Sequence, residues 1–151
     1  MIAYRIADAR HSIFDPTGAM LHGGRWNSRG FRAINAAETY AGALLEVLVH
    51  SNLSEPPKHH RVIRIDVPDQ VEIETVSTTA VPDWDAEDVR ASRAFGDLWI
   101  QENRTAVLRV PSVITSGREN NLLFNPFHHQ FSLIETGAPE PVNWDERLFR
   151  H

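Results

Sequence analysis

Ala43-Leu44-Leu45-Glu46-Val47-Leu48-Val49-His50 has the apolar spacing of a helix that covers a sheet, and one carboxylate interrupts it. The apolar residues recur with a period near 3.6, and they are Ala41, Leu44, Leu45, Leu48 and Val49. We expect a helix from about residue 36 to residue 50. Asn35 is the expected N-cap, and Glu38 three residues later completes a capping-box-like pattern.

Segments of alternating polar and apolar residues predict strands around this helix. We expect strands over residues 3–6, 33–34, 61–67, 71–74, 105–110, 121–124 and 131–135, and an edge strand over 144–149. Residues 15–30, rich in Gly, Asn, Ser and Pro, predict a long loop with a short strand at 25–26. A second helix is expected over residues 86–102, with Asp85 as its cap. Several strands around two helices, without strict βαβ alternation, indicate an α+β fold with a compact mixed or antiparallel sheet.

The composition is that of one folded domain, which we place over residues 1–151. Of the 151 residues, 42% are hydrophobic, and the net charge is −5. That charge argues against direct nucleic-acid binding, which uses a clustered basic face. The absence of cysteine excludes disulfides and cysteine nucleophiles. Because no stretch resembles a membrane span or a signal peptide, we expect a cytoplasmic protein that does not bind membranes.

Glu46 is a carboxylate on an apolar helix, where the loss of hydration is costly. One interpretation is structural: Glu46 lies at the rim of the helix and contacts His50 one turn later. The other is functional: the carboxylate points into a cleft, and Gly42 keeps the preceding turn open. There it stabilises an oxocarbenium-like centre or polarises an attacking hydroxyl, as the cleavage of a glycosidic bond requires. The residues alone leave both interpretations open.

Gly23-Gly24-Arg25-Trp26-Asn27 places one cation directly after two glycines. Consecutive glycines let a backbone approach a ligand closely or adopt a positive φ. A pyrophosphate or a carboxamide fits against such a loop, with Arg25 as a clamp. The structural alternative is a tight turn in which Arg25 stacks on Trp26.

Ser112 follows Pro111 at the end of the strand predicted around Leu108-Arg109-Val110. No Gly-x-Ser-x-Gly pattern surrounds it, so we do not expect a nucleophile. We expect its hydroxyl either to hydrogen-bond a ligand or to hold Glu46. The structural alternative is a serine that satisfies local backbone groups at the end of a strand.

Two histidine doublets, His59-His60 and His128-His129, do not predict a metal site. Adjacent residues of a strand point to opposite faces, and no His-Glu-x-x-His pattern or acidic ligand cluster accompanies them. We therefore expect no metal. The Gly-x-Gly-x-x-Gly and P-loop patterns of nucleotide-binding folds are also missing from the sequence.

Segments spread over nearly the whole chain resemble the RES-domain family, the toxin component of RES–Xre toxin–antitoxin pairs. These segments are Tyr4-Arg5-Ile6, Gly23-Gly24-Arg25-Trp26-Asn27, Ala43-Leu44-Leu45-Glu46-Val47-Leu48-Val49-His50, Gly96-Asp97-Leu98-Trp99, Leu108-Arg109-Val110-Pro111-Ser112, Asn125-Pro126-Phe127-His128 and Arg147-Leu148-Phe149. The family is similar in fold to ADP-ribosyltransferase toxins of the diphtheria-toxin type, and its members consume NAD⁺. The resemblance therefore implies that architecture, with NAD⁺ as the substrate.

The resemblance also implies roles for individual residues. Arg25 grips NAD⁺, Glu46 stabilises the nicotinamide ribose as the C–N bond breaks, and Ser112 completes the pocket. The residues implied to bind NAD⁺ are Gly24, Arg25, Trp26, Asn27, Asn35 and Ser112. The implied function is that of a bacterial toxin that cleaves NAD⁺ by hydrolysis or phosphorolysis and is neutralised by an Xre-type antitoxin protein.

One residue departs from the family's pattern, because Asn35 stands where the resemblance predicts a tyrosine. An asparagine cannot stack on nicotinamide as a phenol does, although it can hydrogen-bond ribose or the carboxamide. Two alternatives therefore stay open. One is a mono-ADP-ribosyltransferase that modifies a specific cellular protein, and the other is a non-catalytic domain that binds a nucleotide or the antitoxin.

Overall fold

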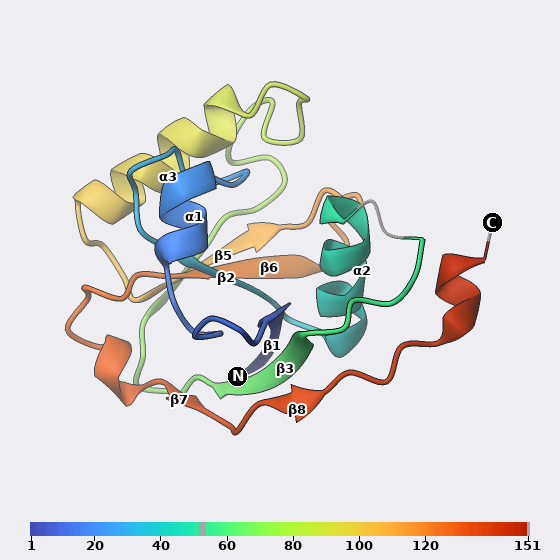
Figure 1. The fold of residues 1–151 in the computed structure, drawn as a ribbon. Helices are drawn as coiled ribbons and strands as arrows, with labels where there is room; N and C mark the ends of the chain where they lie inside the picture. Colours follow the sequence, from blue (N-terminus) through green and yellow to red (C-terminus); the bar gives the residue numbers. More distant parts are fainter. Residues whose placement is uncertain (52–53, 151) are drawn as a thin grey trace.

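The computed structural model describes residues 1–51 and 54–150, which form one curled, eight-stranded mixed sheet with α-helices packed on it (Figure 1). The strands are β1 (Ile2–Asp8), β2 (Ile34–Ala37), β3 (His60–Asp66), β4 (Ile73–Thr75), β5 (Val107–Pro111), β6 (Asn120–Phe124), β7 (Glu135–Thr136) and β8 (Glu140–Pro141). The helices are α1 (Thr17–His22), α2 (Tyr40–His50), α3 (Arg90–Gln101) and the 3₁₀ helices η1 (Phe131–Leu133) and η2 (Glu146–Phe149). The strand order is β4-β5-β6-β2-β1-β3-β7, and β8 also pairs with β3. Strands β4 and β5 are parallel and the other pairs are antiparallel, so the α+β prediction is confirmed.

The sheet has a weak seam between β1 and β2. Strand β1 pairs with β3 along its whole length but with β2 at one position, Tyr4 opposite Ala37. Strand β2 in turn pairs with β6 along its whole length. The sheet therefore consists of two well-paired parts, β4-β5-β6-β2 on one side and β1-β3 with β7 and β8 on the other.

Alternation along the central strands supplies apolar side chains to both faces of the sheet. Leu122 and Phe124 of β6 are buried on one face, whereas Leu123 lies on the other face with Trp99 of α3. Helix α2 covers a third cluster, whose buried members are Ile6, Ala37, Ala43, Val47 and Val62. The core thus fixes α2 and α3 on separate parts of the sheet.

Helix α2 begins later than predicted. Its N-cap is Thr39, whose side-chain oxygen accepts a hydrogen bond from the Gly42 amide at 2.9 Å. The prediction of Asn35 as the cap is wrong because residues 34–37 belong to β2. Pairing of β2 with β6 outweighs the local helix-start pattern of this segment.

Helix α3 also begins later than predicted, at Arg90. The prediction of a helix start near residue 86 with Asp85 as its cap is wrong. The backbone carbonyls next to Asp85 are bound by a residue from another part of the chain. The carbonyls of Trp84 and Ala86 accept hydrogen bonds from the guanidinium of Arg25. A contact with a distant residue therefore replaces the first turn of the expected helix.

The remaining differences lie in short elements. Residues 15–30 contain α1 and no strand at 25–26, and residues 131–135 form η1 and the first residue of β7 instead of one strand. The predicted edge strand over 144–149 is also wrong, because η2 occupies this segment. Pro141 pairs with Arg61 in antiparallel register, and β3 begins at His60. The residues after Pro141 therefore extend beyond the start of β3, where β3 offers them no further backbone partners.

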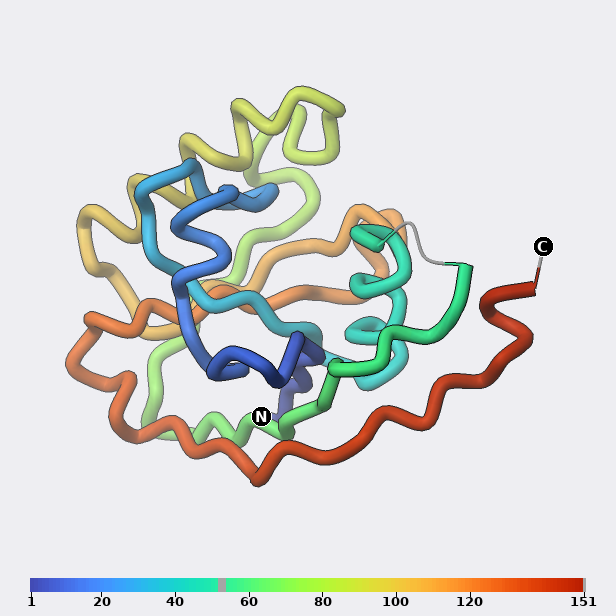
Figure 2. The backbone as a smooth tube through the Cα atoms, viewed as in Figure 1, coloured from blue at the N-terminus to red at the C-terminus, as the bar shows by residue number. Residues whose placement is uncertain are grey.

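The C-terminal segment follows the outer edge of β3 and then leaves the sheet toward η2 (Figure 2). Trp144 packs against the cluster under α2 and lies edge-on to Phe149, with the ring centroids 5.8 Å apart. These contacts hold residues 144–149 near the cluster under α2. Within the residues that the structure describes, none of the helices is both long and apolar enough for a membrane span.

Candidate active site

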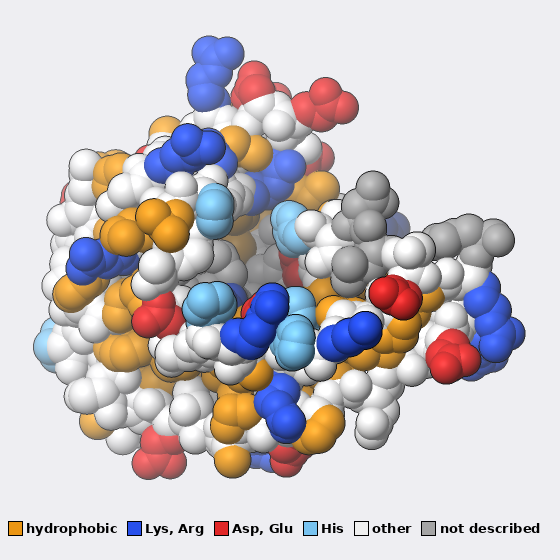
Figure 3. All heavy atoms as spheres, viewed as in Figure 1, with side chains coloured by type: hydrophobic (Ala, Val, Ile, Leu, Met, Phe, Trp, Pro, Cys, Tyr) orange, Lys and Arg blue, Asp and Glu red, His pale blue; other side chains and the backbone are white. Residues whose placement is uncertain are grey.

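A cleft of about 710 Å³ opens over the seam between β1 and β2. Its walls come from α1 and the glycine loop after it, from α2, and from β1 and β2. The start of β3, the end of β5 with the segment that follows it, and β6 complete the lining. Histidine side chains gather around a hollow between α1 and α2 (Figure 3), and the histidines that line the cleft are His22, His50 and His60. The predicted site residues that line it are Gly24, Arg25, Trp26, Asn35 and Glu46.

Gly23 and Gly24 form a tight turn after α1. Gly23 has a φ of 73°, and its amide donates to Ala19 O at 2.8 Å. The Gly24 amide donates to Asn27 O at 2.8 Å, and a Cβ on Gly24 would lie only 2.9 Å from Asn27 Oδ1. The fully buried Asn27 donates from Nδ2 to the carbonyls of Ala19 and Phe31 at 3.0 and 3.2 Å. Asn27 therefore holds the loop from inside and does not line the cleft.

Arg25 is oriented by backbone carbonyls on the far side of the loop. One terminal nitrogen donates to Trp84 O at 3.0 Å and to Ala86 O at 2.9 Å. A guanidinium carries five N–H groups, so these two bonds fix its direction without using its whole donor set. The ring of Trp26 is 4% exposed and packs edge-on against Phe95 at 6.1 Å. Trp26 is therefore a core residue, and its partner is Phe95 and not Arg25.

Helix α3 anchors the loop that carries Arg25. Three of its side chains bond the loop: the Ser92 hydroxyl donates to Arg25 O at 2.6 Å, Arg93 Nε donates to Gly24 O at 2.8 Å, and Asp97 accepts from the Ser28 amide and hydroxyl at 2.8 and 2.5 Å. These bonds satisfy loop carbonyls and an amide that would otherwise lose water on burial. The loop is therefore fixed relative to α3 before any ligand binds.

Glu46 extends from α2 into the cleft, and both of its carboxylate oxygens are engaged. Oε1 accepts a hydrogen bond from Asn121 Nδ2 at 2.8 Å, and Oε2 lies 3.2 Å from His50 Nε2. The side-chain contact with Glu46 raises the pKa of His50, and partial burial acts in the opposite direction. The expected contact between Glu46 and His50 is confirmed, and it coexists with a place in the cleft.

Arg5 of β1 is a second cation in the wall of the cleft, and no site role was predicted for it from the sequence. Its Nε donates to Ile13 O and a terminal nitrogen donates to Asn35 O, both at 2.6 Å. Burial lowers the pKa of Arg5 below its usual value, and the nearby Asp15 carboxylate opposes this effect in part. Ala3, two residues earlier on the same face, is fully buried. A cation on the same strand face as a buried alanine is the sequence signal that could have identified Arg5.

Asn35 lies in the middle of β2, opposite the glycine loop. Its backbone pairs with Leu123 of β6, and its half-buried side chain lines the cleft. Asn35 Nδ2 lies 3.9 Å from the position that a Cβ on Gly24 would take. The position at which the family's tyrosine was expected is therefore part of the cleft.

Ser112 is 4% exposed and begins the turn between β5 and β6. Its amide donates to Glu119 O at 3.0 Å, and its carbonyl accepts from the Gly117 amide at 2.8 Å. Ser112 does not line the cleft, although Val113 after it does. In the part of the chain that the structure describes, the side chain across the sheet that bonds Glu46 is Asn121, which sequence reasoning missed.

The described residues contain no group of three or more His, Cys, Asp or Glu side chains that is placed to hold a metal ion. The histidine doublet His128-His129 makes local structural contacts. His128 Nδ1 accepts from the Gln130 amide at 3.1 Å, and its ring stacks on that of His129 with centroids 4.4 Å apart.

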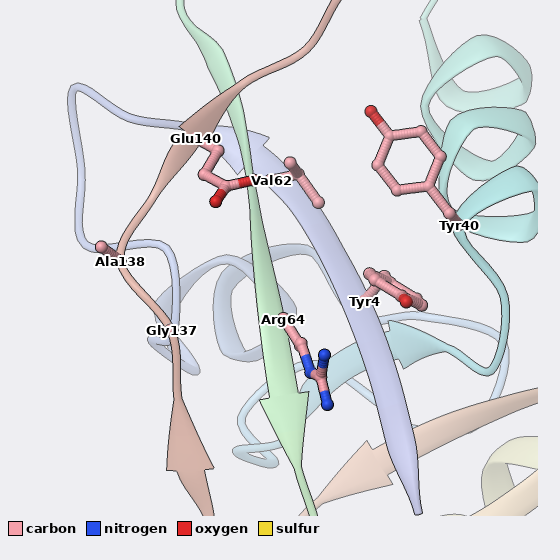
Figure 4. Close-up of a pocket in the computed structure, with 7 residues that line it drawn as sticks. All are labelled: Tyr4, Tyr40, Val62, Arg64, Gly137, Ala138 and Glu140. Atoms are coloured by element: carbon pink, nitrogen blue, oxygen red, sulfur yellow. The ribbon is translucent and has the colours of Figure 1, made fainter.

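A second, smaller pocket of about 370 Å³ lies between the start of α2 and the C-terminal strands (Figure 4). Tyr4 and Tyr40 meet edge-on there, with ring centroids 5.7 Å apart, and Arg64 and Glu140 supply charges of opposite sign. Tyr4 borders both cavities. None of the predicted site residues lines this pocket, so the larger cleft is the candidate active site.

Comparison with known proteins gives a consistent result. Residues 2–145 match the family model described as RES domain. A protein of Sphingobium sp. (strain YBL2) named Prs ADP-ribosylating toxin is 41% identical over 97% of this chain and 96% of its own length. A protein of Photorhabdus laumondii named Toxin Res is 34% identical over 99% of this chain and 98% of its own length. A chain from the crystal structure of the M. tuberculosis MbcT–MbcA toxin–antitoxin complex has the same fold, with a TM-score of 0.76 and 20% identity over 98% of this chain and 86% of that one.

Proposed function

Because this chain belongs to the RES-domain family, we propose that it is the toxin of a toxin–antitoxin pair and cleaves NAD⁺ at the nicotinamide–ribose bond. The observation that carries the proposal is the position of the Glu46 carboxylate in a cleft whose wall also holds Arg5 and Arg25. The cleft volume of about 710 Å³ lies within the range of about 300–1,000 Å³ found for small-molecule sites. The names of the relatives support the same chemistry and biology.

In the proposed reaction, the bond between the ribose and nicotinamide breaks and its electron pair leaves with nicotinamide, which becomes neutral. Positive charge develops on the anomeric carbon and the ring oxygen, and the Glu46 carboxylate stabilises it. The Arg25 guanidinium binds the diphosphate of NAD⁺, which suits its forked donors, and Arg5 adds positive charge to the same wall. An oxygen of the acceptor then bonds to the anomeric carbon and releases its proton.

The other predicted residues have supporting roles in this proposal. Gly24 lets the loop approach NAD⁺, Trp26 and Asn27 fix the loop, Asn35 hydrogen-bonds the ribose or the carboxamide, and Ser112 shapes the wall behind Val113. Water as the acceptor gives ADP-ribose, and phosphate gives its phosphorylated derivative.

A second candidate function is mono-ADP-ribosylation of a specific cellular protein, which the name of the Sphingobium relative favours. In that reaction, a side chain of the acceptor protein takes the place of water or phosphate. The exposed position of the cleft beside α1 and α2 is compatible with such an acceptor. Both candidates use Glu46 in the same way and differ in the acceptor alone.

We also propose that an Xre-type antitoxin binds this protein and that both act in the cytoplasm. The shared fold with a chain from a toxin–antitoxin complex supports an antitoxin partner. The Xre type and the cytoplasmic location rest on the family resemblance. Purification together with the product of the neighbouring gene is the direct test, and the absence of a complex would count against this partner.

The test of the reaction is product analysis by mass spectrometry after incubation of the purified protein with NAD⁺, with and without phosphate and cell lysate. We expect nicotinamide release by the wild type and a loss of about 10²–10³ in kcat for Glu46→Gln. Glu74→Gln is the matched control. The Glu74 side chain is 29% exposed, like that of Glu46, but it pairs with Arg104 outside the cleft.

The products decide between the candidates. Free ADP-ribose or its phosphate indicates hydrolysis or phosphorolysis, and a mass increment on a lysate protein indicates a transferase. Unchanged product formation by folded Glu46→Gln would contradict the catalytic role of Glu46. Absence of any Glu46-dependent product in all conditions would instead favour the non-catalytic binding domain.

A further inference from the structure

The carboxylate of Glu46 is held from two sides by groups of different character. His50, on the next turn of α2, is exposed over 76% of its side chain and lies 3.2 Å from Oε2. Asn121 comes from the sheet, is half-buried in the wall of the cleft, and donates to Oε1 at 2.8 Å. The His50 contact lies along the helix surface, whereas the Asn121 contact draws the carboxylate toward the sheet. The direction of Glu46 into the cleft therefore depends on Asn121.

Asn121 is itself fixed by its place in the sheet. It lies in β6, where its backbone pairs with Ala37 of β2 on one side and with Val110 of β5 on the other. A residue between two paired strands has little freedom to shift, so its side-chain amide is a rigid donor. The amide is also neutral, and it donates to a carboxylate without changing its own protonation.

We infer that Asn121 is the positioning residue of the site: its amide holds the Glu46 carboxylate in the orientation that stabilises positive charge on the ribose. A hydrogen bond to an ionised acceptor is short and strong compared with a bond between neutral groups. Catalysis by charge stabilisation needs the charge to be in place before the bond breaks. Asn121 meets this need without touching the substrate. The inference rests on the proposed function, since it assigns Asn121 a part in the same reaction.

The neighbouring residue provides a matched control. Asn120 is adjacent on β6, so its side chain points to the opposite face of the strand, where it donates to Glu38 Oε2 at 3.3 Å. Glu38 also accepts from Arg109 Nε at 2.5 Å. Neither Asn120 nor Glu38 lines the cleft. Two adjacent asparagines thus each bond a glutamate, and one of the two glutamates is in the cleft.

The experiment measures kcat and KM for NAD⁺ consumption in four variants, each checked for folding by thermal unfolding. For Asn121→Ala we expect kcat to fall by about 10- to 100-fold, the kinetic equivalent of one charge-assisted hydrogen bond. The KM for NAD⁺ should change by less than about 3-fold, because Arg25 is untouched. For Asn120→Ala we expect both constants to stay within about 2-fold of the wild type.

Two further substitutions separate positioning from packing. Asn121→Asp keeps the shape of the side chain but replaces the donor by a second carboxylate, so we expect kcat to fall below that of Asn121→Ala. Asn121→Gln keeps the amide on a longer stem, so we expect partial recovery. A residue that acts through packing alone would give the opposite order, with the isosteric Asn121→Asp closest to the wild type.

The outcomes are distinct. If the wild type consumes NAD⁺ and Asn121→Ala or Asn121→Asp does so equally well, the inference is overturned and the proposed function stands. A change in KM with an unchanged kcat would also overturn it, because it would place Asn121 in substrate binding. If the wild type shows no Glu46-dependent turnover of NAD⁺ under any condition, the proposed function fails first, and the inference fails with it.

Discussion

Gly96 of α3 marks the closest approach between that helix and the loop that carries Arg25, and replacement by alanine tests how tightly the two are coupled. A Cβ on Gly96 would overlap Trp26 O and would lie 2.8 Å from the carbonyl carbon of Trp26 and 3.3 Å from its Cβ. The nearest atoms belong to backbone that is held in place, so they cannot move aside as a flexible side chain does. Gly96→Ala must therefore push α3 and the loop apart by about 1 Å or more.

The size of the effect follows from this overlap. Overpacking of a well-packed interior costs about 1–3 kcal/mol, and each kcal/mol lowers the Tm of a domain of this size by about 2–4 °C. We therefore expect the Tm to fall by about 2–12 °C. The bond that Arg93 donates to Gly24 O and the bond that Asp97 accepts from the Ser28 amide flank Gly96, so the displacement also moves the loop. The KM for NAD⁺ should rise more than kcat falls, because Glu46 lies on α2.

The assay combines thermal unfolding followed by circular dichroism with steady-state kinetics of NAD⁺ consumption. Gly18→Ala is the control for the Tm, since it makes the same change in α1, where a Cβ would meet nothing within 4 Å. It is not a control for the kinetics, because Gly18 lines the cleft. Alanine favours a helix by up to about 1 kcal/mol over glycine, so this variant should be neutral or slightly more stable. An unchanged Tm for Gly96→Ala would refute the close approach of α3. A lowered Tm with an unchanged KM would refute the coupling to Arg25.

Two further predictions concern the cleft. The contact with Glu46 raises the pKa of His50 in the folded protein. The stabilisation that this contact gives the folded state is therefore complete below the unfolded pKa of about 6.5. It is lost as the pH rises through the higher pKa of the folded state. The difference in Tm between the wild type and His50→Gln should therefore shrink with rising pH, and a constant difference would contradict the assignment. Asn35→Tyr should raise NAD⁺ consumption, since it places in the cleft the ring that the family resemblance predicts. Equal rates measured by nicotinamide release would show that the missing ring does not limit turnover.

Elements whose structure follows from their own local pattern were predicted correctly from the sequence. Predictions failed for segments whose backbone is paired with residues far away in the chain. The apolar spacing predicted α2, but the predicted stripe is offset from the buried face, because Ala41, Leu45 and Val49 are exposed and the buried residues are Ala43 and Val47. The single carboxylate singled out Glu46, but the residues alone left open whether it lies at the rim or in a cleft, and the structure places it in the cleft wall. The segment around Asn35 also reads as a helix start, yet its pairing with β6 near Leu123 makes it a strand. Likewise, the carbonyls of Trp84 and Ala86 are bound to Arg25 and do not begin α3. Such partners lie far apart in the chain, and no local pattern of the sequence records them.

The same distinction applies to the residues of the site. Arg25 and Glu46 stand out because charge and glycine, or charge and an apolar stripe, occur together in a short stretch. Asn121 carries no charge and lies in a strand whose pattern is fully explained by pairing and burial. The role inferred for Asn121 depends on a hydrogen bond from β6 of the sheet to Glu46 of α2. Positioning residues of this kind become visible only when the fold brings the two elements together.

The two halves of the cleft are held by different contacts, and this makes their functions separable. Arg25 is fixed through the backbone of its loop by side chains of α3, whereas Glu46 is fixed through its own carboxylate by Asn121 and His50. If Arg25 binds NAD⁺ as proposed, a shift of its loop displaces a binding group and should act on KM. Loss of a contact to the Glu46 carboxylate misdirects the proposed stabilising charge and should act on kcat. Gly96→Ala and Asn121→Ala are therefore expected to shift different constants. If both variants changed KM and kcat in the same proportion, the two walls would behave as one unit, and the division between binding by Arg25 and charge stabilisation by Glu46 would be wrong.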